Sequence, residues 1–201
     1  MPRDPDAKSK HELKREATRA RLIQLGLEKM PVKGFSSTSI RDIVAGSELT
    51  IGAFHYHFAS KEEFFLTLLT EHAATRGAFA DIARRSQATT TMEAVLDALG
   101  GMGSETAMRG DWTLALGDFG QAIRADPQAR VKLADLYAYF IDELGAMIEV
   151  MAERGLVRTD LDARTLAAMA FAAIEGHIFH NEVYGAPLDG VLEAVTRILQ
   201  P

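Results

Sequence analysis

The chain is 201 residues long, has a formal net charge of −6, is 47% hydrophobic and contains no cysteine. This length is enough to bury a core, and the composition excludes a disordered or fibrous protein. The lack of cysteine excludes disulfides, Cys-ligated zinc, iron–sulfur clusters and thiol nucleophiles. The longest stretch without Asp, Glu, Lys or Arg covers residues 49–60, which is too short for a membrane span, and the N-terminus has no signal-peptide pattern. We therefore expect a cytoplasmic protein that does not contact the membrane.

The charge is distributed unevenly along the chain. Residues 1–61 contain eleven Lys and Arg against seven Asp and Glu, a net charge of +4, whereas residues 62–201 carry −10. Opposite signs in two parts of one chain indicate a polyanion-binding module on an acidic body. Chance is the alternative, because an excess of four charges over 61 residues is small.

Apolar residues recur at helical spacing along nearly the whole chain, and strand-like alternation is almost absent. The first predicted helix ends or kinks near Pro31 and Gly34. Ser60 and Glu63 form a capping box, Asp126 starts the longest helix, and Gly155 ends it with a Schellman turn. The predicted helices cover about residues 9–30, 37–45, 50–58, 60–82, 92–99, 112–124, 127–154, 162–184 and 188–199.

Residues 34–65 carry the pattern of a helix-turn-helix, in which the second helix enters the DNA major groove and flanking groups bind phosphates. Ser37 and Thr38 are the predicted N-caps of the first short helix. The apolar positions expected to bury are Ile40, Ile43, Val44, Leu49, Phe54 and Phe58. The positions left facing outward on the second helix are Ile51, Gly52, Ala53, His55 and Tyr56.

This segment resembles the TetR (tetracycline-repressor-like) family of transcriptional regulators over about 45 residues. The residues that carry the resemblance are Gly34-Phe35, Thr38-Ser39-Ile40-Arg41-Asp42-Ile43, Gly52, Phe54-His55-Tyr56-His57-Phe58 and Ser60-Lys61-Glu62. The resemblance implies an all-α fold of about nine helices. It places a three-helix DNA-binding domain in residues 1–60 and a larger helical effector-binding and dimerisation domain in residues 61–201.

The sequence departs from the family pattern at five positions. Glu48 stands in the turn where the family has Gly, and a non-Gly residue in a left-handed conformation costs roughly 1 kcal/mol. Strain at Glu48, or a turn of different shape, is therefore expected there. Ile51 replaces a polar or basic residue, His55 replaces Tyr, and Lys29 and Pro31 replace the usual apolar end of the first helix.

The family resemblance implies seven DNA-contacting residues: Thr38, Arg41, Ile51, Ala53, His55, Tyr56 and Lys61. The Thr38 hydroxyl and the amides at its helix start are expected to hold a phosphate. Lys61 adds a charge contact, Tyr56 and His55 reach phosphates or base edges, and Arg41 reaches either. Ile51 and Ala53 can touch only a thymine methyl or a sugar edge, because neither side chain forms hydrogen bonds.

Basic residues also precede and begin the first helix. Lys8, Lys10, Lys14 and Arg15 are interpreted as solvated residues of a frayed N-terminus, with contact to the DNA backbone as the alternative. An unrelated helical hairpin is the alternative to the whole motif, with Tyr56 and the neighbouring histidines as packing residues. His57 itself is predicted to pack rather than to contact DNA.

The last two predicted helices carry apolar stripes that we expect to pair with a second copy in a four-helix bundle. These stripes consist of Leu166, Ala170, Ile174, Ile178, Leu188, Val191, Leu192, Val195 and Leu199. Burial within one chain is the alternative. A two-fold dimer would place two recognition helices on half-sites about one helical turn apart, on palindromic double-stranded DNA.

Large, adaptable apolar residues could surround a pocket for a small effector in the C-terminal part, although each of them alone is more typical of a core. The residues proposed for this pocket are Met102, Met108, Trp112, Phe119, Tyr137, Phe140, Met147, Met151, Phe171 and His177. His177 and His180 lie three residues apart, but a third ligand is missing from the sequence around them. We therefore expect no metal and no cofactor.

The sequence thus predicts a dimeric repressor that leaves its operator when a small, largely apolar effector binds. An effector-independent DNA-binding regulator is the first alternative, and a small helical enzyme is the second. The enzyme is disfavoured because the chain has no GxSxG, HExxH, Walker or GxGxxG arrangement and no Cys nucleophile.

Overall fold

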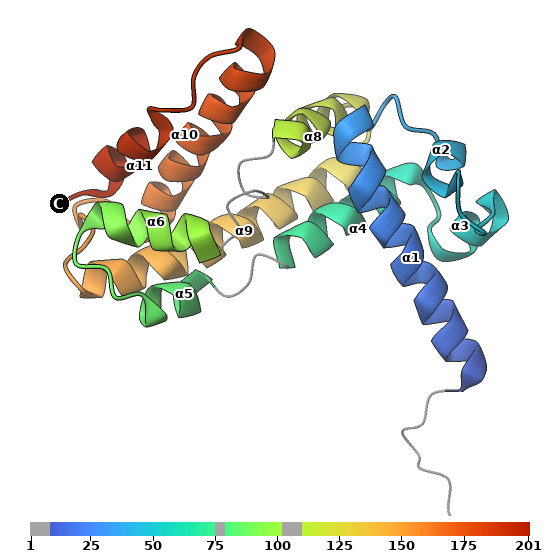
Figure 1. Ribbon diagram of the computed structural model, residues 1–201, viewed down its shortest axis with the longest axis horizontal. Helices are drawn as coiled ribbons and strands as arrows, with labels where there is room; N and C mark the ends of the chain where they lie inside the picture. The colour runs from blue at the N-terminus through green and yellow to red at the C-terminus, as the bar shows by residue number, and fades with distance from the viewer. Residues whose placement is uncertain (1–8, 75–78, 102–109) are drawn as a thin grey trace, which may run out of the picture.

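The computed structural model describes residues 9–74, 79–101 and 110–201, and within these ranges the protein is all-α (Figure 1). Its helices are α1 Lys10–Lys33, α2 Ile40–Val44, α3 Ile51–His57, α4 Lys61–Ala74, α5 Phe79–Arg85, α6 Thr91–Gly101, α8 Gly110–Ala122, α9 Pro127–Glu153, α10 Ala163–Tyr184 and α11 Val191–Leu199. The predicted fold class is confirmed.

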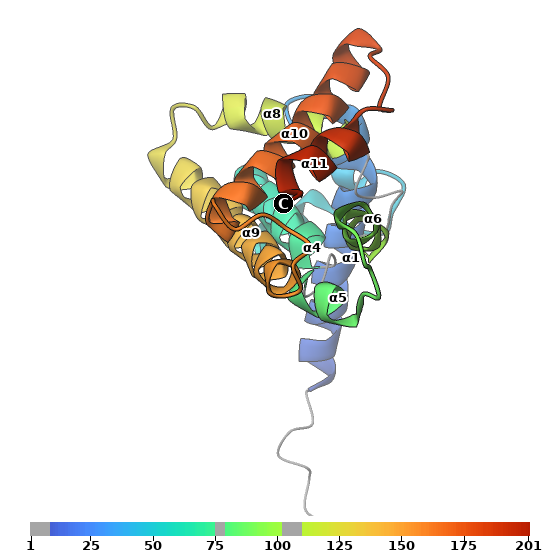
Figure 2. The ribbon, with the colours of Figure 1, turned by 90° about the vertical axis from the view of Figure 1, so that its left-hand side faces the viewer.

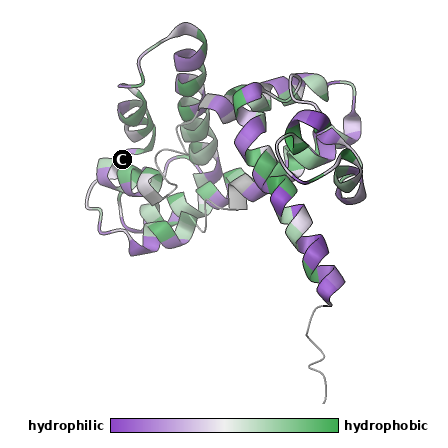
Figure 3. Cartoon of the chain, turned by 45° about the vertical axis from the view of Figure 1, so that its right-hand side comes forward, coloured by the Kyte–Doolittle hydropathy of each residue, from purple (hydrophilic) through white to green (hydrophobic). Residues whose placement is uncertain are grey.

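Two groups of helices lie at opposite ends of an elongated molecule. The α1–α3 group occupies one end, and α5, α6, α10 and α11 occupy the other (Figure 1). Helices α4, α8 and α9 run between them. Figure 2 shows α10 and α11 in front of this connection when the molecule is viewed from the C-terminal end. The beginning of α1 projects from the body and is largely hydrophilic (Figure 3).

The described part of the chain has two apolar cores. The first contains the helix-turn-helix residues Phe35, Phe54 and Phe58, with Phe65 of α4 and Phe119 of α8. The second is built from α5, α6, α9, α10 and α11. Because α4 and α8 supply buried aromatic rings to the first core, that core draws on both sides of the predicted domain boundary at residue 60.

The first helix is longer than the sequence predicts. It continues through Pro31 and ends at Gly34, whose φ of 84° only glycine adopts readily and whose N–H donates to the Met30 carbonyl. Pro31 lies in the last turn, where its missing N–H removes a single hydrogen bond without breaking the helix. Closer to its middle, α1 approaches α4 so tightly that a Cβ on Gly26 would lie 2.6 Å from the Phe64 ring.

Two other predicted helices differ from the structure in what can be compared. Residues 75–78 of the helix expected over residues 60–82 lie outside the described residues, and on either side of them the structure has α4, up to Ala74, and α5, from Phe79. Both pieces pack on α9, so their apolar periodicity reads as one helix. The last helix begins at Val191 rather than Leu188, because the Val191 N–H donates to the Leu188 carbonyl in a turn that precedes it.

Several helix ends agree with their sequence signals. The Asp126 carboxylate accepts hydrogen bonds from two amides at the start of α9. Gly155, with φ 71°, and Leu156 close the Schellman motif at its end, because the Leu156 N–H donates to the Met151 carbonyl at 3.0 Å. At α4 the predicted capping box is only half formed: Ser60 accepts the Glu63 N–H as expected, but the Glu63 carboxylate accepts from Ala59.

Candidate nucleic-acid interface

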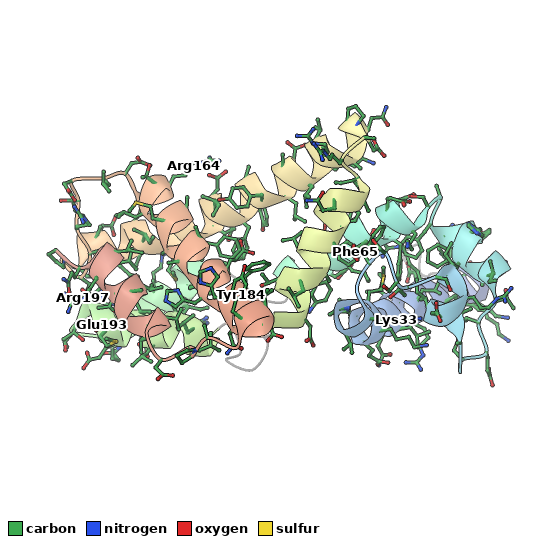
Figure 4. All side chains as sticks on the ribbon, turned by 90° about the horizontal axis from the view of Figure 1, so that it is seen from above. Lys33, Phe65, Arg164, Tyr184, Glu193 and Arg197 are labelled. Carbon is green, nitrogen blue, oxygen red and sulfur yellow. The ribbon has the colours of Figure 1, made fainter. Side chains whose placement is uncertain are left out.

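The start of α2 is fixed by Ser39, one position later than the sequence predicts. The Ser39 hydroxyl accepts the Asp42 N–H, and the Asp42 carboxylate accepts the Ser39 N–H at 2.8 Å, which completes a capping box. Lys33, the last residue of α1, pairs with the same carboxylate at 2.9 Å (Figure 4 labels Lys33). The hydrogen bonds from Ser39 and then the Lys33 contact hold the pKa of Asp42 well below its usual range.

Thr38 has a structural role that differs from the expected one. Its side chain is fully buried, and its hydroxyl donates to the Gly34 carbonyl at 2.6 Å. The prediction that this hydroxyl holds a phosphate is therefore wrong in this conformation, because the oxygen does not reach solvent. The N-cap role assigned to Ser37 and Thr38 passes to Ser39, which is exposed.

The turn between α2 and α3 is organised around Gly46 and Lys29. Gly46 has a φ of 76°, and no non-glycine residue in the described ranges has a positive φ, so Glu48 is not strained. The Lys29 ammonium donates to the carbonyls of Asp42, Ile43 and Ala45 at 3.0, 2.9 and 2.6 Å. Lys29 thereby neutralises the carbonyl end of α2 from the neighbouring helix α1.

One face of helix α3 packs on the core, and the opposite face is exposed to solvent. The Thr50 hydroxyl accepts the Ala53 N–H at 3.0 Å, and the fully buried Phe54 ring packs against the Phe58 and Phe64 rings. The opposite face exposes 66% of Tyr56. The other exposed residues of α3 are Ile51, Gly52 and His55.

Lys61 of α4 faces inward. Its ammonium donates to the Phe35 and Thr38 carbonyls at 2.9 and 3.0 Å and lies 4.2 Å from the centre of the Phe35 ring. Two of its three N–H donors are therefore used within the protein. The phosphate contact predicted for Lys61 remains a prediction, and only its third donor is available for it.

The seven predicted DNA-contacting residues thus fall into three groups. Arg41 on α2 is exposed, as are Ile51, His55 and Tyr56 on α3. Ala53 is partly buried. Thr38 and Lys61 contact each other on the inner side, and both stabilise the loop that precedes α2.

A groove between α1 and α3 was not predicted as a site. Its volume is about 450 Å³, and its lining residues are His11, Lys14, Arg15, Thr18, Ala53, Tyr56 and His57. His57 is partly buried there, and burial, followed by the nearby charges of Arg15 and Arg19, lowers its pKa below 6.5. Lys14 and Arg15 had been interpreted as solvated residues. The sequence signal that could have revealed the groove is the helical spacing of His11, Lys14, Arg15 and Thr18, which shows them on one face of α1.

The loop between α1 and α2 is also attached to α8. The Asp118 carboxylate accepts hydrogen bonds from the Ser36 N–H at 2.6 Å and from the Ser36 hydroxyl at 2.5 Å. Beside this contact, the Phe119 ring packs edge-on against Phe35 with ring centres 4.8 Å apart. Helix α8 therefore holds the helix-turn-helix by both a polar and an aromatic contact.

The residues predicted to bind an effector do not form one cluster. Trp112 and Phe119 belong to the first core, Tyr137 is about half exposed, and Met102 and Met108 lie outside the described residues. The second core brings together Phe140, Met147, Met151 and Phe171. Three of these, Met147, Met151 and Phe171, line an apolar cavity of about 50 Å³ together with residues of α6, α10 and α11.

His177 of the predicted effector set lies on α10, where its Nδ1 contacts the Ala173 carbonyl at 2.7 Å. It does not line the apolar cavity. Within the described ranges, no group of three or more His, Cys, Asp or Glu side chains is arranged to hold a metal ion.

Most of the apolar residues predicted for dimerisation pack within the chain. Leu166, Ile178, Val195 and Leu199 are each no more than 3% exposed. They are buried because α10 packs on α9 and α11, and α11 packs on α6. These four residues are therefore not available to a partner, whereas Ile174, Leu188 and Leu192 of the same stripes are partly exposed, and pairing through the last two helices stays a prediction. A different side of α10 exposes apolar side chains, namely Met169, Phe179, Val183 and Tyr184.

The helix-turn-helix geometry agrees with the sequence comparisons. The family described as "Bacterial regulatory proteins, tetR family" matches residues 22–68, which run from the middle of α1 into α4. Over this segment the chain is similar to the TetR family of bacterial regulatory proteins. Together with the relatives described next, this similarity supports a DNA-binding transcriptional regulator.

Two curated relatives of this chain are named as repressors. The transcriptional repressor DhaR of Mycobacterium sp. (strain GP1) is 25% identical over 202 residues, which cover 93% of this chain and 94% of DhaR. The repressor AcnR of Corynebacterium efficiens is 25% identical over 165 residues, covering 82% of this chain and 81% of AcnR.

Solved structures of bacterial proteins share the fold. Reduced NemR of E. coli superposes with a TM-score of 0.69 at 17% identity, covering 92% of this chain and 98% of NemR. The regulatory protein TetR of Rhodobacter sphaeroides gives 0.66 at 22% identity, with 90% and 98% covered. In the described part of the chain, no helix combines the length and apolarity that a membrane crossing requires.

Proposed function

We propose that this protein is a cytoplasmic repressor that binds a palindromic operator as a homodimer and leaves it when a small, largely apolar effector binds. The observation that carries the DNA-binding part is the fixed recognition helix. Phe54 and Phe58 anchor α3 in the core, while Tyr56, His55 and Ile51 extend from its exposed side. A rigid short helix with an open polar and aromatic face suits insertion into a major groove.

The exposed residues offer two kinds of contact to DNA, hydrogen bonds and apolar contacts. Arg41 on α2 and Tyr56 and His55 on α3 can donate hydrogen bonds to phosphates or base edges, and Ile51 can contact a thymine methyl. Ala53 is partly buried and offers only its methyl group. Contacts to the backbone fix the register of the protein, and the few base contacts select the sequence.

The exposed side of α10 supports the homodimer. Met169, Phe179, Val183 and Tyr184 lie along this helix, with 41% to 71% of each residue exposed. A row of large apolar side chains left in water by one chain is typical of a protein–protein interface. A second copy that covers it would retain the predicted pairing through the last two helices, on a corrected face.

Effector binding is supported by the chemistry of the second core. Leu144, Met147, Met151 and Phe171 line its cavity, so an effector there would be mainly apolar. TetR-fold structures have been solved with quite different ligands: FadR of Bacillus subtilis with stearoyl-CoA and a regulator of Saccharomonospora viridis with choline. We therefore infer the effector class from the lining of this cavity alone.

The size of the cavity favours a second candidate function, an effector-independent regulator. About 50 Å³ is far below the ~300–1,000 Å³ of ordinary ligand pockets, so an effector must widen the cavity on binding. Thermal unfolding in the presence of small apolar compounds separates the two functions. Compounds that raise the Tm and also release DNA support the effector. A library without any such compound supports the effector-independent regulator.

The test of DNA binding is selection from a pool of random double-stranded DNA. We expect enrichment of an inverted repeat, which the protein then binds with an affinity that falls steeply as salt is raised, because phosphate contacts release counterions. A pool that shows no sequence enrichment after repeated selection would reject the proposed function.

A further inference from the structure

The groove between α1 and α3 joins two surfaces that the sequence analysis treated separately. Tyr56 belongs to the exposed face of the recognition helix, and it also forms one wall of the groove. Opposite it lie Lys14, Arg15 and Thr18, in the projecting part of α1. The face assigned to base reading therefore continues directly onto a face that carries basic side chains.

The groove is electropositive. Lys14 and Arg15 line it, Arg19 follows one turn later, and the charges of Arg15 and Arg19 both act on His57. The acidic residues of this part of α1, Glu12 and Glu16, are not among the lining residues. The Glu12 carboxylate is held instead by the Ser9 N–H, at 2.7 Å, in the N-terminal capping box of α1.

We propose that this groove binds the sugar–phosphate backbone of the DNA strand next to the major groove that α3 enters. Lys14 and Arg15 supply the charge contacts, and the Tyr56 hydroxyl can donate to a phosphate oxygen. The Thr18 hydroxyl instead donates to the Lys14 carbonyl at 2.9 Å, so Thr18 lines the groove without a phosphate contact of its own. The proposal rests on the proposed function, because Tyr56 lies beside the DNA backbone only when α3 is inserted into the DNA major groove. It gives the first turns of α1 a direct part in DNA binding.

Charge removal at the groove tests this site. The double variant Lys14→Gln/Arg15→Gln is titrated with the duplex that the wild-type protein selects from the random pool, at several salt concentrations. Each lost phosphate contact lowers the slope of log K against log[salt] by about 0.9, so we expect a slope smaller by about one to two for each bound chain. The affinity at physiological salt should fall about tenfold or more.

A matched control separates a local contact from a change in net charge. Arg130 and Lys132 are exposed on α9 and do not line the groove. The variant Arg130→Gln/Lys132→Gln loses the same charge, and we expect it to keep the wild-type slope. Circular dichroism and thermal unfolding verify that each variant is folded before DNA is added.

Replacing single DNA phosphates with uncharged groups identifies which phosphate the groove contacts. Methylphosphonate groups replace single phosphates of the selected duplex, one position at a time. We expect positions at which this replacement weakens the wild-type protein but not Lys14→Gln/Arg15→Gln. An unchanged salt slope in the folded variant, or equal losses for both proteins at every position, would overturn the groove site and leave the proposed function intact. Failure of the wild-type protein to select any duplex would instead overturn the proposed function itself.

Discussion

At the scale of single residues, two lysines stabilise the helix-turn-helix from within. Lys29 donates to three carbonyls at the end of α2, and Lys61 donates to two carbonyls in the loop before it. Each ammonium therefore compensates several backbone dipoles at once. The sequence indicated Lys29 only as a departure from its family and Lys61 only as a phosphate contact.

Replacing Lys61 with Met tests its internal role. The variant keeps much of the side-chain length but leaves the Phe35 and Thr38 carbonyls without this donor, so we expect the free energy of unfolding to fall by about 1–3 kcal/mol. Urea denaturation measures this change, and Lys61→Arg serves as the conservative control. A side chain that only bound phosphate would leave the unfolding free energy of Lys61→Met at the wild-type value.

His57 makes stability depend on pH. Burial and the nearby Arg15 and Arg19 lower its pKa in the folded protein below 6.5, so the unfolded chain takes up the proton first as pH falls. This contribution to stability is complete above pH 6.5 and is lost as the pH falls through the pKa of the folded state. We expect His57→Gln to lose less stability than the wild type over this window.

An NMR titration of the imidazole signals measures the pKa of His57 in the folded protein directly. His57 should titrate below pH 6.5. In Arg19→Gln its pKa should rise, because a like charge that disfavours the protonated form is removed. A His57 titration at or above pH 6.5 in the wild-type protein would contradict this account.

At the scale of the helices, local signals predicted their ends well. Asp126 and Gly155 act within a few residues of their own position, so a sequence pattern contains the whole interaction. The turn after α2 followed the same rule, since Gly46 supplied the positive φ that Glu48 avoids. The misplacement of the α2 N-cap by one residue shows the limit, because burial of Thr38 depends on the packed core.

Packing between distant helices could not be predicted from the sequence. The apolar residues of α10 and α11 have correct helical spacing, but only the positions of α6 and α9 determine which side of each helix faces inward. The groove beside α3 was missed for the same reason, as its two walls are about 40 residues apart in the chain. The contact of Ser36 with Asp118 joins residues 82 positions apart.

This contact gives a prediction for α8. The Asp118→Ala variant removes both hydrogen bonds to Ser36 and frees the loop before α2, so we expect a loss of about 1–2 kcal/mol in unfolding free energy. Hydrogen exchange should increase first at the amide of Ser36 and in α2. Exchange that rises equally over all helices would contradict a local attachment of this loop to α8.

At the scale of the whole molecule, two cores lie at opposite ends and α4, α8 and α9 connect them (Figure 1). The end with α3 carries the proposed recognition surface, and the end with α10 carries exposed apolar residues, with Tyr184 at the end of α10 (Figure 4). This separation lets the proposed dimer contact and DNA contact act without competing for the same surface.

Introducing a charged residue on the exposed side of α10 tests the proposed dimer. We expect Phe179→Glu to shift the sedimentation coefficient from dimer to monomer, because it introduces a charge into the proposed apolar interface. Tyr139→Glu, at an exposed aromatic position of α9, is the matched control and should remain dimeric. If Phe179→Glu sediments as the wild type does, Phe179 does not lie in the dimer interface.

The central claim is that two copies of α3 occupy successive major grooves of one duplex. Hydroxyl-radical footprinting of the selected duplex with the wild-type protein tests it most directly. The account predicts two protected patches on one side of the DNA, related by two-fold symmetry and separated by about one helical turn or a multiple of it. Protection of a single patch, or uniform protection without symmetry, would contradict the claim.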